Sequence, residues 1–234
     1  MMDLSAVMDA TWPAAQTRRS GPWLLREGQG GGKRVSAATA EGPWQPEDIA
    51  LAEQAQAALG QPALFRLREG DAALDAELAA RGYRLLDPVV AYAAPVAQLA
   101  SVPVPPICAF PIWPPLAIQN EIWDEGGIGP ARRAVMQRVR GARTSFLGRI
   151  NDRAGGSAFI ALHGQTAMLH ALHIVPEQRR NRLATHLVHG AAQWAEAQGA
   201  VNLSLVVTRD NAPARALYAS LGMEIVGEYH YRMK

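Results

Sequence analysis

The sequence of 234 residues has one cysteine, Cys108, and only two lysines among its 23 basic residues. A single cysteine cannot form an internal disulfide and cannot supply a thiolate zinc cluster. The formal net charge of +2 at pH 7 is too small to indicate nucleic acid as the main partner. Hydrophobic residues nevertheless make up 49% of the chain, which is enough to build a packed core.

Long apolar runs are also absent. No stretch of about 18 apolar residues occurs, so we expect no transmembrane helix and no membrane partner. The first residues, MMDLSAVMDATWPAAQ, contain Asp3 and Asp9 and lack the continuous apolar run of a signal peptide. We therefore expect a cytoplasmic protein.

The length fits two compact units of about 100–130 residues each. A proline-rich segment, SVPVPPICAFPIWPP at residues 101–115, separates them. Neither a helix nor a central strand continues through prolines at this density. The expected domains are therefore residues 1–103 and 104–234.

The second half alternates strand-like and helical segments. The helix predicted over 183–198 has its apolar residues on one face and is followed by Gly199. Asn211 is placed to cap the next helix, which ends before Gly222. Strands are expected over 144–150, 157–162, 165–175, 201–208 and 224–233. This order predicts a mixed α/β sheet.

The first half repeats the end of this pattern, with helices expected over 49–59 and 71–80 and strands over 63–68 and 83–94. The segment GQPALFRLREGDAALDAELAARGY has nearly the same length between its glycines as GAVNLSLVVTRDNAPARALYASLGM. An internal duplication explains this, although any two αβαβ units look alike at this level. The glycines of GQGGG, residues 28–32, predict a hairpin of strands 22–27 and 33–39.

The stretch LHIVPEQRRNRLAT, residues 172–185, carries the clearest chemical signal. It is a strand, a proline, an arginine-rich turn and the start of a helix. The first amides of a helix and its dipole favour a bound anion, and Arg179, Arg180 and Arg182 add positive charge. The alternative is an ordinary solvated loop of basic character.

A second motif, NAPARALYASLGM at residues 211–223, follows the next strand. Together the two motifs resemble those of the GNAT acyltransferase superfamily. That family's pyrophosphate loop, Arg/Gln-x-x-Gly-x-Gly/Ala, matches Arg179 to Ala184. Its later motif, Asn-x-x-Ala-x-x-x-Tyr-x-x-x-Gly-Phe/Met, matches the second stretch. Its Leu-x-Val-x-Pro strand matches Leu172, Ile174 and Pro176.

The resemblance covers residues 107–234 and is weaker in the first half. It implies a tandem GNAT protein of the α/β (α+β) class, built from two units that each have a mixed, mostly antiparallel sheet flanked by helices. The second unit would bind the cofactor. The first would be degenerate, because AEGPWQPED replaces the arginine-rich turn and Leu78 replaces the tyrosine.

The cofactor implied by the resemblance is acetyl-CoA. Arg182 departs from the family, which prefers glycine there. A helical backbone at 182 would allow the arginine to point outward, and direct contact of its side chain with phosphate is the other interpretation. The residues implied in cofactor binding are Leu172, His173, Ile174, Arg179, Arg180, Asn181, Arg182, Leu183, Ala184, Thr185, Asn211 and Ala214.

The implied reaction is direct attack of a primary amine, on a small molecule or a peptide, upon the thioester in a ternary complex. Tyr218 matches the residue that protonates the leaving thiolate. Met168 stands where many members have a glutamate and cannot act as a base. His170, on the same strand face, is the candidate base, with a buried structural histidine and a water relay as the alternatives.

Two other functions stay open at this point. One is a non-catalytic, regulatory protein that binds acyl-CoA, and the other is a nucleotide-binding protein with a basic turn. We expect no metal site, because His186 and His189 lack a third ligand. A monomer or homodimer is expected.

Overall fold

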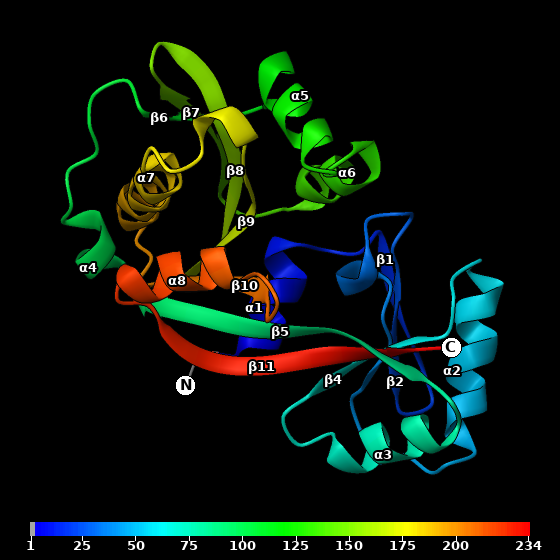
Figure 1. Cartoon of the computed structure of the whole chain (residues 1–234). Helices are drawn as coiled ribbons and strands as arrows, with labels where there is room; N and C mark the ends of the chain where they lie inside the picture. Colours follow the sequence, from blue (N-terminus) through cyan, green and yellow to red (C-terminus); the bar gives the residue numbers. More distant parts are fainter. Residues whose placement is uncertain (1–2) are drawn as a thin grey trace. The chain divides into compact units, whose positions relative to one another are not determined.

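The computed structural model describes residues 3–234 and divides into two compact units (Figure 1). The larger unit contains the described residues up to Pro13, Ala91–Val206 and Ala212–Val226. The smaller unit contains Ala14–Val90, Val207–Asn211 and Gly227–Lys234. Neither unit is a continuous segment of the chain.

The sheet of the larger unit is mixed and mostly antiparallel, as predicted. The pairs β6–β7, β7–β8 and β8–β9 are antiparallel, and β9–β10 is parallel. The last residues of β5 (Arg84–Pro95) lie beside β10. The other strands are β6 (Ala109–Ile112), β7 (Arg143–Ile150), β8 (Arg153–His163), β9 (Thr166–Ile174) and β10 (Asn202–Thr208).

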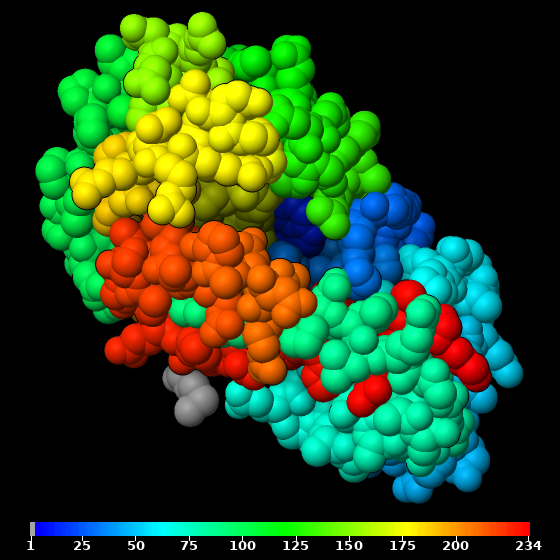
Figure 2. Space-filling model, viewed as in Figure 1, coloured from blue at the N-terminus to red at the C-terminus, as the bar shows by residue number. Residues whose placement is uncertain are grey.

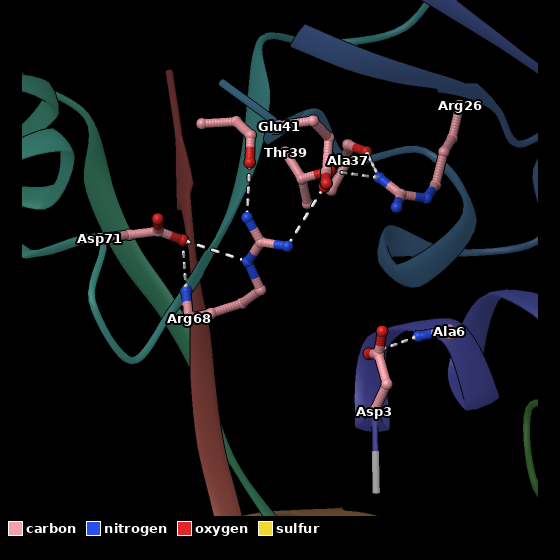
Figure 3. A network of polar contacts seen from close by, with 9 residues as sticks. Asp3, Ala6, Arg26, Ala37, Thr39, Glu41, Arg68 and Asp71 are labelled. Atoms are coloured by element: carbon pink, nitrogen blue, oxygen red, sulfur yellow. Dashed lines mark hydrogen bonds and ion pairs between the residues drawn. The ribbon is translucent and has the colours of Figure 1, made fainter. Parts of the chain in front are cut away.

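Helices cover both faces of this sheet (Figure 1). Helix α7 packs on β7, β8 and β9, because Gly148 and Gly156 allow Leu187 to approach the strands closely. Helices α1 and α5 pack against β8 and β9. Asp3 caps α1 by accepting a hydrogen bond from the Ala6 amide at 3.0 Å (Figure 3). The helices are α1 (Leu4–Thr11), α4 (Val96–Ala100), α5 (Ala117–Glu125), α6 (Pro130–Arg138), α7 (Leu183–Ala197) and α8 (Ala212–Ser220).

The smaller unit has its own hydrophobic core and contains a separate three-stranded sheet. Strands β1, β2 and β3 are antiparallel, Ala38 forms a parallel bridge with Phe65 of β4, and β4 pairs antiparallel with β11. Helices α2 and α3 contribute buried apolar residues, among them Ile49 and Leu78, to the core around Trp23. The elements are β1 (Gln16–Ser20), β2 (Trp23–Glu27), β3 (Thr39–Ala40), α2 (Asp48–Ala58), β4 (Leu64–Arg68), α3 (Ala72–Ala80) and β11 (Glu224–Met233).

The order of elements is repeated along the chain. The segments β1-β2-β3-α2-β4-α3-β5 and β7-β8-β9-α7-β10-α8-β11 have the same succession of strands and helices. The final strands are exchanged, because β11 lies beside β4 and β5 lies beside β10. The repeated order agrees with the duplication expected from the sequence.

The compact units differ from the domains predicted as 1–103 and 104–234. The strand exchange is one reason, since β5 and β11 each have residues in both units. The other reason is that α1 and α4 pack within the larger unit, where α4 contacts α7. The first two residues of the predicted first domain lie outside the described residues.

The hairpin predicted around GQGGG is only partly present: the first strand is β2, which pairs antiparallel with β3 at Thr39 and Ala40, but residues 33–38 do not form the predicted second strand. Gly30 and Gly32 have φ values of +77° and +100° and lead into a 3-10 helix, η1 (Lys33–Val35), instead of a second strand. The chain then returns so close to Gly28 that a Cβ there would lie 2.0 Å from the Ser36 hydroxyl. The observed hairpin joins β1 and β2.

Ion pairs connect the elements of the smaller unit. Arg68 at the end of β4 contacts the carboxylates of Glu41 and Asp71 (Figure 3). Asp75 of α3 accepts hydrogen bonds from Arg232 at 2.7 and 3.1 Å and lies 2.7 Å from Nε2 of His230. The Arg232 guanidinium, opposed by desolvation and assisted by His230, lowers the pKa of Asp75 to about 2.

Replacing Asp75 by asparagine should lower the free energy of unfolding at pH 7 by about 1–3 kcal/mol, because Arg232 then loses its charged acceptor. A carboxylate whose pKa is lowered by folding stabilises the folded state fully above its ordinary pKa, which is 3.8 for Asp75. This stabilisation is lost as the pH falls through about 2. Urea unfolding between pH 3 and 7 should show a wild-type advantage that begins to shrink below about pH 4.

Glu77→Gln is the matched control on the same helix. Glu77 pairs with Arg81 one turn away, and both side chains are about one-third exposed. Its loss should cost only about 0.5 kcal/mol. Equal effects of the two substitutions would contradict a special contribution from Asp75.

Candidate active site

The parallel pairing of β9 and β10 ends before the strands do. Its register runs from Asn202↔Thr166 to Leu205↔Leu169. Residues 170–174 of β9 continue beside β8 but have no partner in β10. This segment therefore has no ladder partner from β10, and its Ala171 and Ile174 carbonyls accept hydrogen bonds from the side chains of Trp123 and Arg179 instead.

A β-bulge interrupts β9 in the same segment. Ser157 pairs with His173, but Phe159 pairs with His170, so β9 has one extra residue between the two pairs. Ala171 has a φ of +52°, and its carbonyl accepts a hydrogen bond of 2.8 Å from Nε1 of Trp123. Because the extra residue shifts the alternation, His170 and His173 lie on the same face of the sheet.

The turn before α7 has an unusual backbone. After the 3-10 helix η2 (Pro176–Gln178), Arg180 and Arg182 have φ values of +64° and +62°. Arg182 is therefore left-handed, so the helical backbone that would have allowed an arginine there without strain is absent at this position. Left-handed residues near a helix start point successive amides into one concavity, which suits an anion.

The start of α7 itself is favourable for an anion. Helix α7 has no acidic residue in its first turn, and Arg182 at the N-cap makes no side-chain cap. The side chains of Arg180, Asn181 and Arg182 are exposed on the surface, where Figure 2 shows the turn in yellow. Arg179 is held differently, because its Nε donates to the Ile174 carbonyl at 3.1 Å.

The remaining residues implied in cofactor binding lie on either side of this turn. Leu172, His173 and Ile174 are half-buried at the end of β9. Leu183 is buried, while Ala184 and Thr185 are half-buried in the first turn of α7. Asn211 directly precedes α8, and Ala214 lies in its first turn.

Tyr218 is the buried residue of α8. Its ring lies 5.8 Å from that of Tyr92, a buried residue of β5, and the Tyr92 hydroxyl accepts a hydrogen bond of 3.4 Å from Nε of Arg215. Desolvation raises the pKa of Tyr218 to about 12. The phenol is therefore protonated throughout the neutral range.

His170 is buried in a polar and aromatic environment. Its Nε2 lies 2.9 Å from the hydroxyl of Thr11. Its ring is 5.0 Å from Trp12 and 6.2 Å from Phe159. This nitrogen of the predicted base therefore already has a partner within the protein.

Several residues of the site were missed by sequence reasoning. Thr11 comes from α1 and Trp12 directly follows that helix, while Tyr92 comes from β5 and Trp123 from α5. None of them belongs to a short motif, and their contacts join segments far apart in the sequence. The sequence carries one signal for the helix that brings Thr11 to the site, namely Asp3, which is a favourable N-cap residue directly before α1.

The two histidines of α7 differ in burial, since His189 is buried and His186 is half-buried. Nδ1 of His189 lies 2.8 Å from the Leu99 carbonyl oxygen, and desolvation lowers the pKa of His186. Within residues 3–234, no group of three or more His, Cys, Asp or Glu side chains is placed to hold a metal ion.

Comparison with known proteins defines the class. Residues 116–223 match the Acetyltransferase (GNAT) family. The match covers both motifs, β9, α7, β10 and α8. The match therefore assigns a GNAT acetyltransferase domain to residues 116–223, as the resemblance of the motifs implied, and members of this family generally bind acyl-CoA.

Similar individual proteins span the whole chain. The uncharacterised N-acetyltransferase YobR of Bacillus subtilis (strain 168) is 26% identical, over 96% of this chain and 95% of its own length. A GCN5-related N-acetyltransferase from Kribbella flavida has a TM-score of 0.73 at 17% identity, covering 99% of this chain and 94% of that one. A tandem GNAT protein from the clavulanic acid biosynthesis pathway has a TM-score of 0.62 at 16% identity, covering 100% and 88%. The structural likenesses establish the fold.

In the described part of the chain, no helix has the length and apolar character needed to cross a membrane.

Replacing Arg182 by glycine should raise the free energy of unfolding by about 1 kcal/mol, because glycine has no Cβ penalty in the left-handed region. Arg179 has an ordinary φ of −67°, so Arg179→Gly should instead lower this free energy by about 0.5–1 kcal/mol. Chemical denaturation of the two variants measures both changes. Destabilisation by both would argue against a strained backbone at 182.

Proposed function

We propose that this protein is an acetyl-CoA-dependent N-acetyltransferase that acetylates a primary amine of a small molecule or peptide by direct attack in a ternary complex. The observation that supports it most is the arrangement around two parallel strands. Helix α7 follows β9 and α8 follows β10, so the basic turn and the helix of Tyr218 both begin near the end of the parallel pairing.

The basic turn suits the diphosphate of coenzyme A. Its left-handed residues, the uncapped first turn of α7 and the exposed arginines all favour a multiply charged anion. Backbone N–H groups at Leu183, Ala184 and Thr185 would donate to phosphate oxygens, with Arg180, Asn181 and Arg182 around them. Arg179 would act by holding the end of β9 through Ile174.

The separated end of β9 would orient the acyl group. When bound, acetyl-CoA supplies the activated thioester. The free edge of Leu172–Ile174 offers backbone groups that align its pantetheine arm, and an N–H there would stabilise negative charge on the carbonyl oxygen. Asn211, directly before α8, and Ala214, in the first turn of α8, would line the same binding site for acetyl-CoA.

Tyr218 would hold the proton that the leaving sulfur needs. With a pKa of about 12 the phenol carries this proton at every working pH. Transfer would occur as negative charge develops on the sulfur, so that the hydroxyl acts as a general acid.

A second candidate is an acyl-CoA-binding regulatory protein without transfer activity. This candidate is favoured by Met168, which is fully buried on β9 and cannot act as a base. Many members of the family have a glutamate at the matching position. This protein would bind acetyl-CoA but would not release free thiol in the presence of any amine.

Release of free thiol from acetyl-CoA with a panel of primary amines tests the proposal. Tyr218→Phe should lower kcat by at least about 100-fold, because the general acid is lost while the ring remains. Calorimetry should show acetyl-CoA binding within about threefold of wild type. Unchanged turnover in Tyr218→Phe would remove the acid role, and binding without turnover in the wild type would favour the regulatory protein.

A carboxylate at the start of α7 tests the cofactor site separately. Ala184→Asp should weaken acetyl-CoA binding by at least about tenfold, because the new charge repels the diphosphate. The same new charge at the exposed Ala197, in the last turn of α7, is the control. Equal loss in Ala184→Asp and Ala197→Asp would place the diphosphate elsewhere.

A further inference from the structure

Two buried polar atoms of the larger unit, within residues 3–234, lack a hydrogen-bond partner and belong to residues that face each other across β8 and β9. They are the hydroxyl oxygen of Ser157 and Nε2 of His173. Ser157 is fully buried. Leaving a polar group in the interior without a partner is unfavourable, so a ligand or an ordered water is expected there.

Both side chains point to the face of the sheet opposite α7. Gly156 and Ile174 lie against each other on the α7 side, since a Cβ at Gly156 would lie 2.6 Å from Cδ1 of Ile174 and 3.1 Å from Leu187. Ser157 and His173 are their neighbours in sequence and therefore point to the other face. Directly paired residues of antiparallel strands have Cβ atoms about 4.5–5.5 Å apart, so one water can span the pair.

The surroundings of His173 suit a proton acceptor. Its ring packs against Gly126 at the end of α5, where a Cβ would lie 2.6 Å from Nδ1. Desolvation lowers the pKa of His173, Arg179 lowers it further, and Glu125 opposes both. The imidazole is therefore neutral at pH 7.

We infer that Ser157 and His173 hold one water between them, and that His173, reached through this water, accepts the proton of the acceptor amine. The burial of Nε2 excludes direct contact with the amine and makes the water necessary. The ammonium nitrogen gives a proton to the water oxygen, and the water gives one of its protons to Nε2. The amine keeps its lone pair, the imidazole becomes an imidazolium, and the Ser157 hydroxyl positions the water.

This inference rests on the proposed function for its chemistry, but the water site can be tested without turnover. A high-resolution crystal structure of the free protein should show a water within about 3.2 Å of both Ser157 Oγ and His173 Nε2. A direct Ser157–His173 hydrogen bond, or no water on either atom, would overturn the inference.

Kinetics test the proton transfer. His173→Gln should lower kcat at least about 100-fold and abolish the acidic limb of the pH profile below pH 6.5, with KM for acetyl-CoA unchanged. Ser157→Ala should lower kcat about tenfold and leave the acidic limb of the pH profile in place. Ser204→Ala is the matched control, because this buried serine already donates to the Ala167 carbonyl. It should leave kcat and the pH profile unchanged.

A glycine substitution displaces the imidazole without removing it. Gly126 has an ordinary φ of −79°, so the backbone accepts alanine and only the contact with His173 changes. Gly126→Ala should lower kcat at least about tenfold, whereas Gly42→Ala, at a glycine without close neighbours, should not.

The outcomes separate the two proposals. The role of His173 is overturned if the His173→Gln variant turns over with the acidic limb of its pH profile intact. It is also overturned if only the His170→Gln variant loses that limb. Either result leaves the proposed acetyltransferase activity unaffected. A wild type that turns over no amine overturns the acetyltransferase together with the proton transfer, and the crystallographic water then decides the site alone.

Discussion

The hydrogen bond from Trp123 to the carbonyl of Ala171 fixes the feature on which the site depends. It holds a left-handed residue inside β9, where a regular strand would have none. The resulting bulge turns His173 to the same face as His170 and accompanies the end of the pairing with β10. The irregular residues at the end of β9 thus provide the strand edge without a β10 partner and place His173 beside Ser157. They also lead directly to the turn before α7.

The smaller unit has the same order of elements but the opposite electrostatics. Helix α2 corresponds to α7, yet it begins with Glu47 and Asp48, and the Asp48 carbonyl accepts a hydrogen bond from Trp23. Leu78 of α3, at the place corresponding to Tyr218, is fully buried in the core. The repeated order of elements therefore has a basic turn before α7 in the second segment, and acidic residues at the start of α2 and a buried Leu78 in the first.

Much of the fold was predictable because its signals are local. The amphipathic pattern of α7 and the motifs around Arg179 and Tyr218 each lie within one short segment, and so indicated the family and most of the elements. The left-handed backbone of Arg182 is not indicated by the residue itself, and its one signal is the glycine that the family motif has at this position. The bulge at Ala171, the contact of α1 with His170 and the exchange of the last strands depend on residues that are distant in sequence.

The exchange of β5 and β11 also affects how the chain is held together. Residues 229–233 at the end of the chain pair with residues 64–68, on the other side of the proline-rich segment 101–115. A protease cut within that segment would therefore yield a noncovalent complex of two fragments, because each fragment completes a sheet of the other. For the same reason, each half of the chain alone would lack a strand that pairs with its own strands in the intact protein.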